Sequence, residues 1–463
     1  MKKLLSSLIA CSLILNATAQ APQLFGMAEN GGSFNQGTIF KMNPNGSGVT
    51  VVHNFSSPAG WKPQGNLLQA SDGNLYGTCY EGGIYASCTI FRFNPSTNTY
   101  ADVWDFDITN GDFPESGVIE GPGGILYGVT PHGGTSYSGV IYSYNIASDI
   151  YTALYSFNNT LGNSPFGSPI LVGNKLYGLT TSGGAKGVGV LYSYDLTSST
   201  YSNLHDFESA QGANPYGSLF KASDGKLYGM TRSAGANAGG TIFSYDMNTS
   251  TFTHLYDFNS STGSNPYGSL VQSSSGMMYG LASTGGINNG GVIFSFNPTN
   301  NSYAKLDLDN TSGTSPIGDL MLDANGNLYG TTSQGGTYSY GTAFSFDPTG
   351  NIFTKLLDFD GVIGSNPNGT FIPVSATATG ITDMEFDKDM KLFPNPTTGE
   401  FTVHNLHFTI GYELKITNTL GETILQKTIN RKQETVTLSA ASGIYFLHVK
   451  TPDGVAVKKI IKE

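Results

Sequence analysis

Charged residues are scarce in this chain: they make up 12% of its 463 residues, against about a quarter in average soluble domains. Basic residues are the scarcer kind, because residues 1–390 contain 13 Lys and Arg against 27 Asp and Glu. Such an acidic segment repels nucleic acid and anionic lipid, so neither is expected as a partner. From residue 391 the balance reverses to 9 basic against 6 acidic residues, which indicates a domain boundary.

Long apolar runs and catalytic motifs are also missing. Beyond the N-terminus no segment reaches the roughly twenty apolar residues that cross a bilayer as a helix. The chain has no nucleophile elbow, zinc-protease helix motif, phosphate-binding loop or EF-hand spacing. Carboxylates on neighbouring repeats could pair as in glycosidases, but one sequence does not show such pairing. We therefore predict no enzyme activity, no cofactor and no metal site.

Glycine and aromatic residues are abundant instead. The chain contains 61 Gly and 53 Tyr plus Phe, a combination typical of many short strands joined by tight turns. The glycines have no three-residue period, which excludes collagen. The composition therefore predicts an all-β protein.

The first 19 residues read as a signal peptide. Lys2 and Lys3 precede an apolar stretch that ends near Leu15, and small residues end at Ala19, so we expect the mature chain to start at Gln20. A lipoprotein signal at Cys11 is the alternative, but the apolar stretch continues past it. The chain is thus predicted to be exported.

Removal of the signal peptide, which contains Cys11, leaves two cysteines, Cys79 and Cys88. In an oxidising compartment so close a pair is expected to form a disulfide. Metal binding by the two thiols is the weaker interpretation, because no histidine lies near them in the sequence.

Seven copies of a unit of about fifty residues fill most of the chain. Three markers recur in phase, and in-phase markers over seven units indicate a repeat fold. They are an aromatic residue before Gly, a proline, and a bulky apolar residue. The aromatic residues are Phe25, Tyr76, Tyr127, Tyr177, Tyr228, Tyr279 and Tyr329. The prolines are Pro63, Pro114, Pro165, Pro215, Pro266, Pro316 and Pro367. The apolar residues are Phe55, Phe106, Phe157, Phe207, Phe258, Leu308 and Phe359.

One unit divides into four short strands, predicted at residues 269–272, 278–282, 292–297 and 303–308, with turn residues between them. Four antiparallel strands per unit describe a propeller blade, and an open solenoid is the alternative. The first unit lacks its first strand, and a surplus matching piece appears at residues 364–373. This split favours a seven-bladed β-propeller at residues 20–374, closed by a C-terminal strand that pairs near Leu24, because closure removes exposed sheet edges.

The recurring residues have structural interpretations. The aromatic residue before Gly is expected to pack between neighbouring blades, with Gly allowing close backbone approach. The bulky apolar residue is expected in the core. Identical residues in every copy usually serve packing rather than ligand binding.

Functional variation is expected in the loops that join the second and third strands of each unit. Aromatic or acidic additions gather in the first three and the last, which a closed ring makes neighbours, and such residues suit sugar stacking or peptide binding. The candidate ligand-binding residues are Glu29, Phe34, Tyr80, Glu81, Tyr85, His132, Tyr137, Tyr338 and Tyr340. The alternative is that they are ordinary surface residues of Gly-rich loops.

The residues that open the inner strands form a second set. In a closed ring they would surround the channel mouth as a collar of small polar groups, which solvate the channel or contact a ligand. They are Asn66, Gly117, Ser168, Ser218, Ser269, Asp319 and Thr370.

After a polar linker at residues 375–390, residues 391–463 carry further strand patterns and a basic, apolar end. This segment closely resembles the type A sorting domain of the type IX secretion system of Bacteroidota, although Phe393 stands where Tyr is usual. The matching residues are Phe393, Pro394, Asn395, Pro396, Thr398, Gly399, Gly443, Ile444, Tyr445, Lys458 and Lys459. The resemblance implies a small β-sandwich that the secretion machinery recognises, and delivery to the cell surface or the medium.

The repeats at residues 22–373 resemble the Gloeo/Verruco (GloVer) tandem-repeat family, which implies no particular activity. The expected function is an exported, non-catalytic binding module for polysaccharide or a surface protein. A structural or adhesion component of the envelope and a propeller glycoside hydrolase or lyase are the alternatives.

Overall fold

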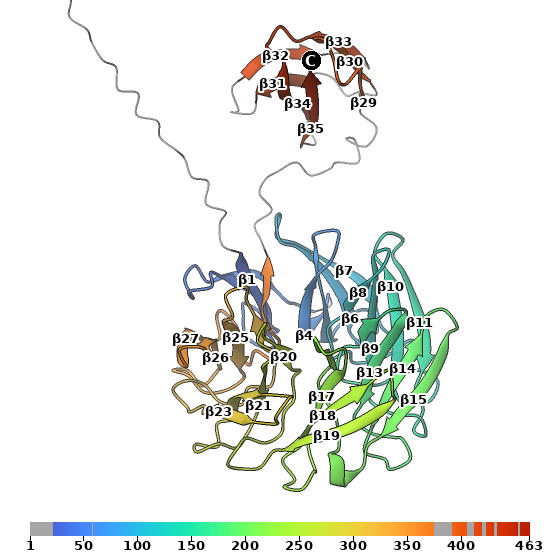
Figure 1. The fold of residues 1–463 in the computed structure, drawn as a ribbon, viewed down its shortest axis with the longest axis vertical. Coiled ribbons are helices and arrows are strands. Elements are labelled where there is room, and N and C mark those ends of the chain that lie inside the picture. Colours follow the sequence, from blue (N-terminus) through green and yellow to red (C-terminus); the bar gives the residue numbers. More distant parts are fainter. Residues whose placement is uncertain are drawn as a thin grey trace, which may run out of the picture. The chain divides into compact units, whose positions relative to one another are not determined.

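The computed structural model describes residues 22–57, 59–374, 391–404, 412–418, 423–429, 433–451 and 454–463 (Figure 1). The predicted signal peptide and the predicted linker lie outside these residues. The chain divides into two compact units, residues 1–375 and 376–463. The regular secondary structure of the described residues consists of β-strands and one short 3₁₀ helix, η1 (Ser209–Gln211). Within these ranges, no helix has the length and apolar character needed to cross a membrane.

The described part of the first unit, residues 22–374, is built from seven four-stranded antiparallel sheets, as expected for propeller-like repeats (Figure 1). Sheet 1 has the order β28-β1-β2-β3, and each later sheet contains four consecutive strands. The strands of sheets 1 to 4 are β1 (Gln23–Ala28), β2 (Thr38–Met42), β3 (Thr50–Asn54), β28 (Ile372–Val374); β4 (Trp61–Gln69), β5 (Leu75–Glu81), β6 (Thr89–Asn94), β7 (Thr99–Asp105); β8 (Ile119–Gly121), β9 (Ile125–Thr130), β10 (Val140–Asn145), β11 (Ile150–Ser156); β12 (Ile170–Val172), β13 (Lys175–Thr180), β14 (Val190–Asp195) and β15 (Thr200–Asp206).

Sheets 5 to 7 contain β16 (Phe220–Lys221), β17 (Leu227–Thr231), β18 (Thr241–Asp246), β19 (Thr251–Asp257); β20 (Val271–Gln272), β21 (Met278–Ala282), β22 (Val292–Phe296), β23 (Tyr303–Asp307); β24 (Met321–Leu322), β25 (Leu328–Thr332), β26 (Thr342–Asp347) and β27 (Ile352–Asp358). The four strands predicted between residues 269 and 308 correspond to β20 to β23, with ends that differ by at most two residues.

The two ends of this unit meet in sheet 1. Strand β28 pairs antiparallel with β1, with Leu24 opposite Pro373 and Phe25 opposite Ile372. The predicted pairing of the surplus C-terminal piece with the first repeat is therefore confirmed. Strand β28 also contacts β4, the first strand of sheet 2.

The aromatic-Gly step packs between sheets, as predicted. Tyr76 of sheet 2 is buried in one cluster with Leu126 and Tyr142 of sheet 3. We expected the glycine of this step to allow close approach of another backbone segment. It instead makes room for a side chain, because a Cβ atom on Gly77 would lie 2.5 Å from the Phe91 ring. The periodic apolar residues are core residues, each at most 1% exposed: Phe55, Phe106, Phe157, Phe207, Phe258, Leu308 and Phe359.

Parallel ring stacks join the outer strands of successive sheets. His53 of β3 stacks on Tyr100 of β7 with ring centroids 4.1 Å apart and an interplanar angle of 3°. The same arrangement recurs in Trp104–Tyr151, Tyr155–Tyr201, His205–Phe252 and Tyr256–Tyr303. These five stacks join sheets 1 to 6, each to the next, at their outer strands, as the aromatic-Gly step does further in.

The second unit has two sheets around one core. Their orders are β29-β30-β33 and β32-β31-β34-β35, and both contribute to a buried cluster that contains Phe401, Val436, Leu447 and Ile460. The strands are β29 (Lys391–Phe393), β30 (Glu400–His404), β31 (Tyr412–Asn418), β32 (Thr423–Ile429), β33 (Glu434–Thr437), β34 (Gly443–Thr451) and β35 (Gly454–Lys462).

The closing segment should be essential for the stability of the first unit. Phe371 is 2% exposed and packs with Phe40 of sheet 1 and Phe359 of sheet 7. We expect Phe371→Ala to lower the free energy of unfolding by about 3–5 kcal/mol, the usual cost of truncating a buried Phe. Chemical denaturation measures this, with Ile352→Ala as the control because Ile352 is 57% exposed. Equal effects of the two substitutions would contradict an integral closing strand.

The stacked His53 should make the first unit sensitive to acid. Burial lowers the pKa of His53 from 6.5 to about 4. Between these values the unfolded chain binds a proton that the folded protein does not, so the free energy of unfolding falls as pH falls through this window. His53→Phe keeps a stacked ring without a titratable group. We expect the melting temperature of the wild type to fall further than that of the variant between pH 7 and pH 4.5, and parallel losses would refute this.

Candidate functional site

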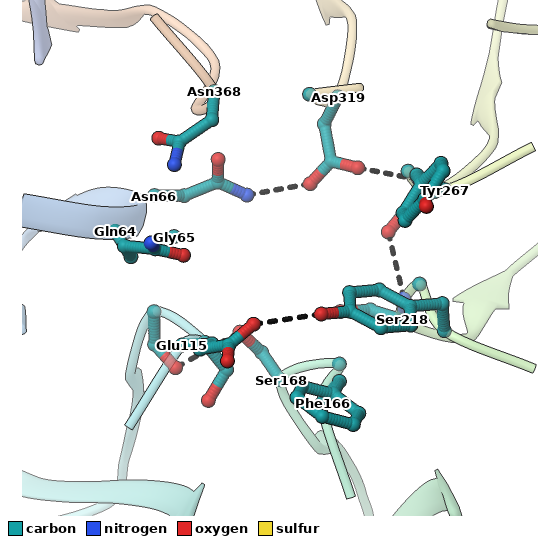
Figure 2. A pocket seen from close by; sticks show the side chains of 18 of the residues that line it. Gln64, Gly65, Asn66, Glu115, Phe166, Ser168, Ser218, Tyr267, Asp319 and Asn368 are labelled. Atoms are coloured by element: carbon teal, nitrogen blue, oxygen red, sulfur yellow. Dashed lines mark hydrogen bonds between the residues drawn. The ribbon is translucent and has the colours of Figure 1, made fainter. Parts of the chain in front are cut away.

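The residue that follows each periodic proline points into one central cavity. These residues are Gln64, Glu115, Phe166, Tyr216, Tyr267, Ile317 and Asn368, one from each repeat. The cavity has a volume of about 140 Å³, and Figure 2 shows side chains from all sides around it. Every repeat therefore contributes one side chain to the same site.

Local backbone geometry directs these side chains inward. The residue before each proline has φ between 51° and 57°, a left-handed conformation that asparagine tolerates better than bulky residues. The proline ring then packs against the preceding repeat: a Cβ atom on Gly139 would lie 2.7 Å from Cδ of Pro165. The left-handed residues are Lys62, Phe113, Ser164, Asn214, Asn265, Ser315 and Asn366.

Four consecutive repeats give the cavity an apolar arc, which consists of Phe166, Tyr216, Tyr267 and Ile317. The rings of Phe166 and Tyr216 are stacked, with centroids 4.3 Å apart and an angle of 12°. Tyr267 meets Tyr216 edge-on at 5.0 Å, and the guanidinium of Arg232 lies 4.4 Å from the Tyr267 centroid.

The other three repeats form a polar arc of Gln64, Glu115 and Asn368. The Tyr216 hydroxyl donates a hydrogen bond of 2.7 Å to Glu115 (Figure 2). Burial raises the pKa of the Glu115 carboxyl, an effect that the Tyr216 hydrogen bond opposes and the charge of Glu29 increases. Asn368 Nδ2 lies 3.5 Å from Glu29 Oε2. Among the described residues, Asn368 Oδ1 is buried without a hydrogen-bond partner.

The predicted collar contributes to the same cavity. Six of its seven residues line it, and Thr370 is the exception. Its members bind mainly one another. Asn66 donates to Asp319 at 2.5 Å and accepts from the backbone of Thr370 at 2.9 Å. Ser168 donates to the carbonyl of Gly117 at 2.9 Å. These bonds connect the repeats around the cavity.

Part of the predicted loop site is brought together. Tyr80 contacts Phe113 at 5.0 Å between ring centroids, Phe113 meets His132 at 6.4 Å, and His132 stacks on Tyr137 at 5.6 Å. The Tyr137 hydroxyl donates to Asp112 at 3.2 Å. Three predicted residues therefore form one row, joined by Phe113, which sequence reasoning missed.

The acidic candidates lie beside the polar arc, and the remaining tyrosines do not join the row. Glu81 forms an ion pair of 2.6 Å with Lys62. Burial raises the pKa of Glu29, which the charge of Lys62 opposes and that of Glu81 increases. Within the described residues, no ring contact links the exposed side chains of Tyr85, Tyr338 or Tyr340 to the row.

Carboxylates on the outer strands hold the loops in place. Asp257 Oδ1 accepts the backbone N–H of Ala236, which directly follows the loop glycine, at 2.7 Å. Corresponding bonds run to Asp105, Asp206, Asp307 and Asp358, and to Asn54 in the first repeat. The loops therefore have anchored bases and variable tips.

The predicted disulfide is absent: Cys79 and Cys88 are free thiols, and both are fully buried. Cys88 occupies the slot of a loop glycine and keeps its left-handed backbone, with φ of 96°. The Cys79 sulfur packs against Gly60, where an added Cβ atom would lie 2.8 Å away. Burial raises the pKa of Cys79 to about 12, and it also raises that of Cys88. High thiol pKa values disfavour the thiolate that disulfide formation needs.

Sequence reasoning did not identify the seven residues that follow the periodic prolines and line the central cavity. The three-residue segment Pro-x-Gly has a constant frame in six of the seven repeats, and its middle residue varies from repeat to repeat. Variation at one position inside a constant frame was the signal that could have revealed the cavity.

Family comparisons account for nearly the whole chain. The model of the Gloeobacter/Verrucomicrobia repeat matches residues 12–188 and 176–392. The chain belongs to this repeat family. No curated protein sequence matches it.

Two solved structures share the fold of this repeat protein. They are putative 6-phosphogluconolactonases from Bacteroides fragilis and Bacteroides uniformis, with 16% and 13% identity and TM-scores of 0.52 and 0.51. They cover 77% and 75% of this chain, and this chain covers 99% of each. PorZ of Porphyromonas gingivalis, an essential bacterial surface component of the type-IX secretion system, matches with 14% identity and a TM-score of 0.43. That match covers 92% of this chain and 63% of the PorZ chain.

Residues 391–463 match the model of a secretion system C-terminal sorting domain, which implies export to the cell surface or beyond. Its motif holds the last strand: Asn395 donates to the carbonyl of Lys459 at 2.7 Å and accepts from the backbone of Ile461 at 2.8 Å. Tyr445 is buried, and its hydroxyl donates to the carbonyl of Ala441 at 2.7 Å. Phe393 is 72% exposed, so the one residue that departs from the usual motif lies at the surface.

The free thiols of Cys79 and Cys88 can be checked chemically. We expect neither to react with iodoacetamide in the folded mature protein, because both are buried with raised pKa values. After denaturation without reductant, both should be alkylated, as mass spectrometry would show. Alkylation that requires a reductant as well as denaturant would instead show that the disulfide forms.

Proposed function

We propose that residues 22–374 form a closed seven-bladed propeller that binds carbohydrate outside the cell without catalysing a reaction. Closure is supported by the pairing of β28 with β1 and by close packing around the centre. Consecutive Pro-x-Gly segments touch, and a Cβ atom on Gly318 would lie 2.7 Å from the carbonyl oxygen of Gly369. Gly369 in turn packs against Gly65 of sheet 2.

The division of the central cavity into two arcs carries the functional proposal. A sugar ring has apolar C–H faces that stack on aromatic rings and a hydroxyl rim that needs hydrogen-bond partners. The apolar arc offers Phe166, Tyr216 and Tyr267 for stacking, and the polar arc offers amides and a carboxylate. A cavity of 140 Å³ is smaller than a typical pocket for a whole ligand, so it suits the terminal unit of a chain.

The surface around the cavity supports a longer ligand. The row Tyr80, Phe113, His132 and Tyr137 runs from the end of β5 to the loop between β9 and β10, and the charges of Glu81 and Glu115 act on Tyr80. Tyr137 is 48% exposed, so its ring is accessible to further sugar units. Exposed aromatic rings near a polar cavity are typical of recognition surfaces.

Binding rather than hydrolysis fits the state of the cavity carboxylates. A glycosidase needs two carboxyl groups that face one glycosidic bond. Asp319 instead accepts hydrogen bonds from Asn66 and from the backbone of Ser269, which commits it to the collar. Glu115 is held by the Tyr216 hydroxyl.

A glycan array with the mature chain tests this function. We expect binding to a defined glycan class, with Phe166→Ala and Tyr267→Ala each weakening affinity about fivefold, because an aromatic contact contributes roughly 1 kcal/mol. Ile352→Ala is the matched control, because this exposed residue follows the β26–β27 turn, at the opposite end of the strand from the cavity. Absence of glycan binding, or equal loss in the control, would refute the proposal.

A further inference from the structure

The charged residues that line the central cavity are all acidic. Glu115 and Asp319 line it, and none of the described residues that line it is a Lys, Arg or His. The cavity of an already acidic chain thus presents carboxylates to whatever enters, and aromatic rings face them from the opposite arc.

Nearby cations are already engaged. Lys62, beside the polar arc, forms its ion pair with Glu81, and the guanidinium of Arg232 lies over the ring of Tyr267. Glu29 approaches the cavity through Asn368, and no ion pair to Glu29 or Glu115 occurs among the described residues. Neither Glu29 nor Glu115 therefore forms an ion pair within the described ranges, although the charge of Lys62 lowers the pKa of Glu29.

Buried carboxylates of this kind favour a positively charged ligand group. Burial raises the pKa values of Glu29 and Glu115, and each carries a further increase from a neighbouring carboxylate. An ammonium group would offset both effects, and it supplies three hydrogen-bond donors to a site that is rich in acceptors. Aromatic faces such as those of the apolar arc also attract cations.

We propose that the central cavity selects a sugar unit with a free amino group, whose ammonium pairs with Glu115 and Glu29 while its ring stacks on the apolar arc. This inference rests on the proposed carbohydrate-binding function and narrows its substrate class. A neutral sugar offers only hydroxyl groups to the same carboxylates, and an N-acetyl group removes the charge.

Three β-1,4-linked tetrasaccharides that differ only at carbon 2 test this selectivity on the mature chain by calorimetry. They are the tetramers of glucosamine, N-acetylglucosamine and glucose. We expect the glucosamine tetramer to bind at least tenfold more tightly than the other two at neutral pH. Raising the salt concentration should reduce this preference, because screening weakens charge pairing.

Variants locate the effect. Glu115→Gln and Glu29→Gln should each weaken binding of the glucosamine tetramer several-fold more than binding of the glucose tetramer. Glutamine at position 115 can still accept the Tyr216 hydrogen bond. Phe166→Ala should weaken all three ligands. Asp149→Asn is the control for general attraction to an acidic protein, because Asp149 lies in the β10–β11 turn, away from the cavity.

The outcomes separate the two proposals. Equal affinity for the three tetramers, or preference for the neutral ones, overturns the amino-sugar inference and leaves carbohydrate binding standing. A glucosamine preference that Asp149→Asn reduces as much as Glu115→Gln does would also overturn it, because the attraction would then be non-specific. Binding of no glycan on the array and of no tetramer refutes both proposals.

Discussion

The packing of a proline ring against a glycine of the preceding repeat is the constraint on which the centre of this protein depends. Pro63, Pro165, Pro215, Pro316 and Pro367 each lie where a Cβ atom on that glycine would collide with the ring. This glycine and the residue before the proline both have left-handed backbone conformations. Together they fix the path of the chain from one sheet to the next. The residue after the proline is thereby directed to the centre.

This arrangement separates stability from recognition. The proline, the glycines and the stacked rings repeat in almost every unit and hold sheet against sheet. The residue between proline and glycine contacts the cavity, so it changes from Phe166 to Asn368 without disturbing the frame. Phe113 is a bulky residue in a left-handed backbone conformation, which such residues rarely adopt. Its ring connects Tyr80 with His132.

Much of the fold could be predicted because its signals are periodic. Strand β21 begins and ends where the alternation and the turn residues predict, and the surplus segment near Thr370 pairs as its sequence match indicates. The site was harder to predict. Tyr80, His132 and Tyr137 do meet, but the exposed Tyr338 and Tyr340 do not join them. Cys79 and Cys88 are close in sequence, yet both are buried free thiols, so the predicted bond is not formed.

Periodic and short-range patterns were enough to predict the repeat, the four strands of each unit, the split first unit and the sorting domain, because all of these depend on residues at regular or short separations. Which residues share the central cavity depends on how the repeats pack in three dimensions. Tyr216 and Glu115 are 101 residues apart, and they meet because each proline turns its successor toward the same centre. The recurring Pro-x-Gly segment marks these positions in the sequence, but their convergence arises from the way the sheets succeed one another in space.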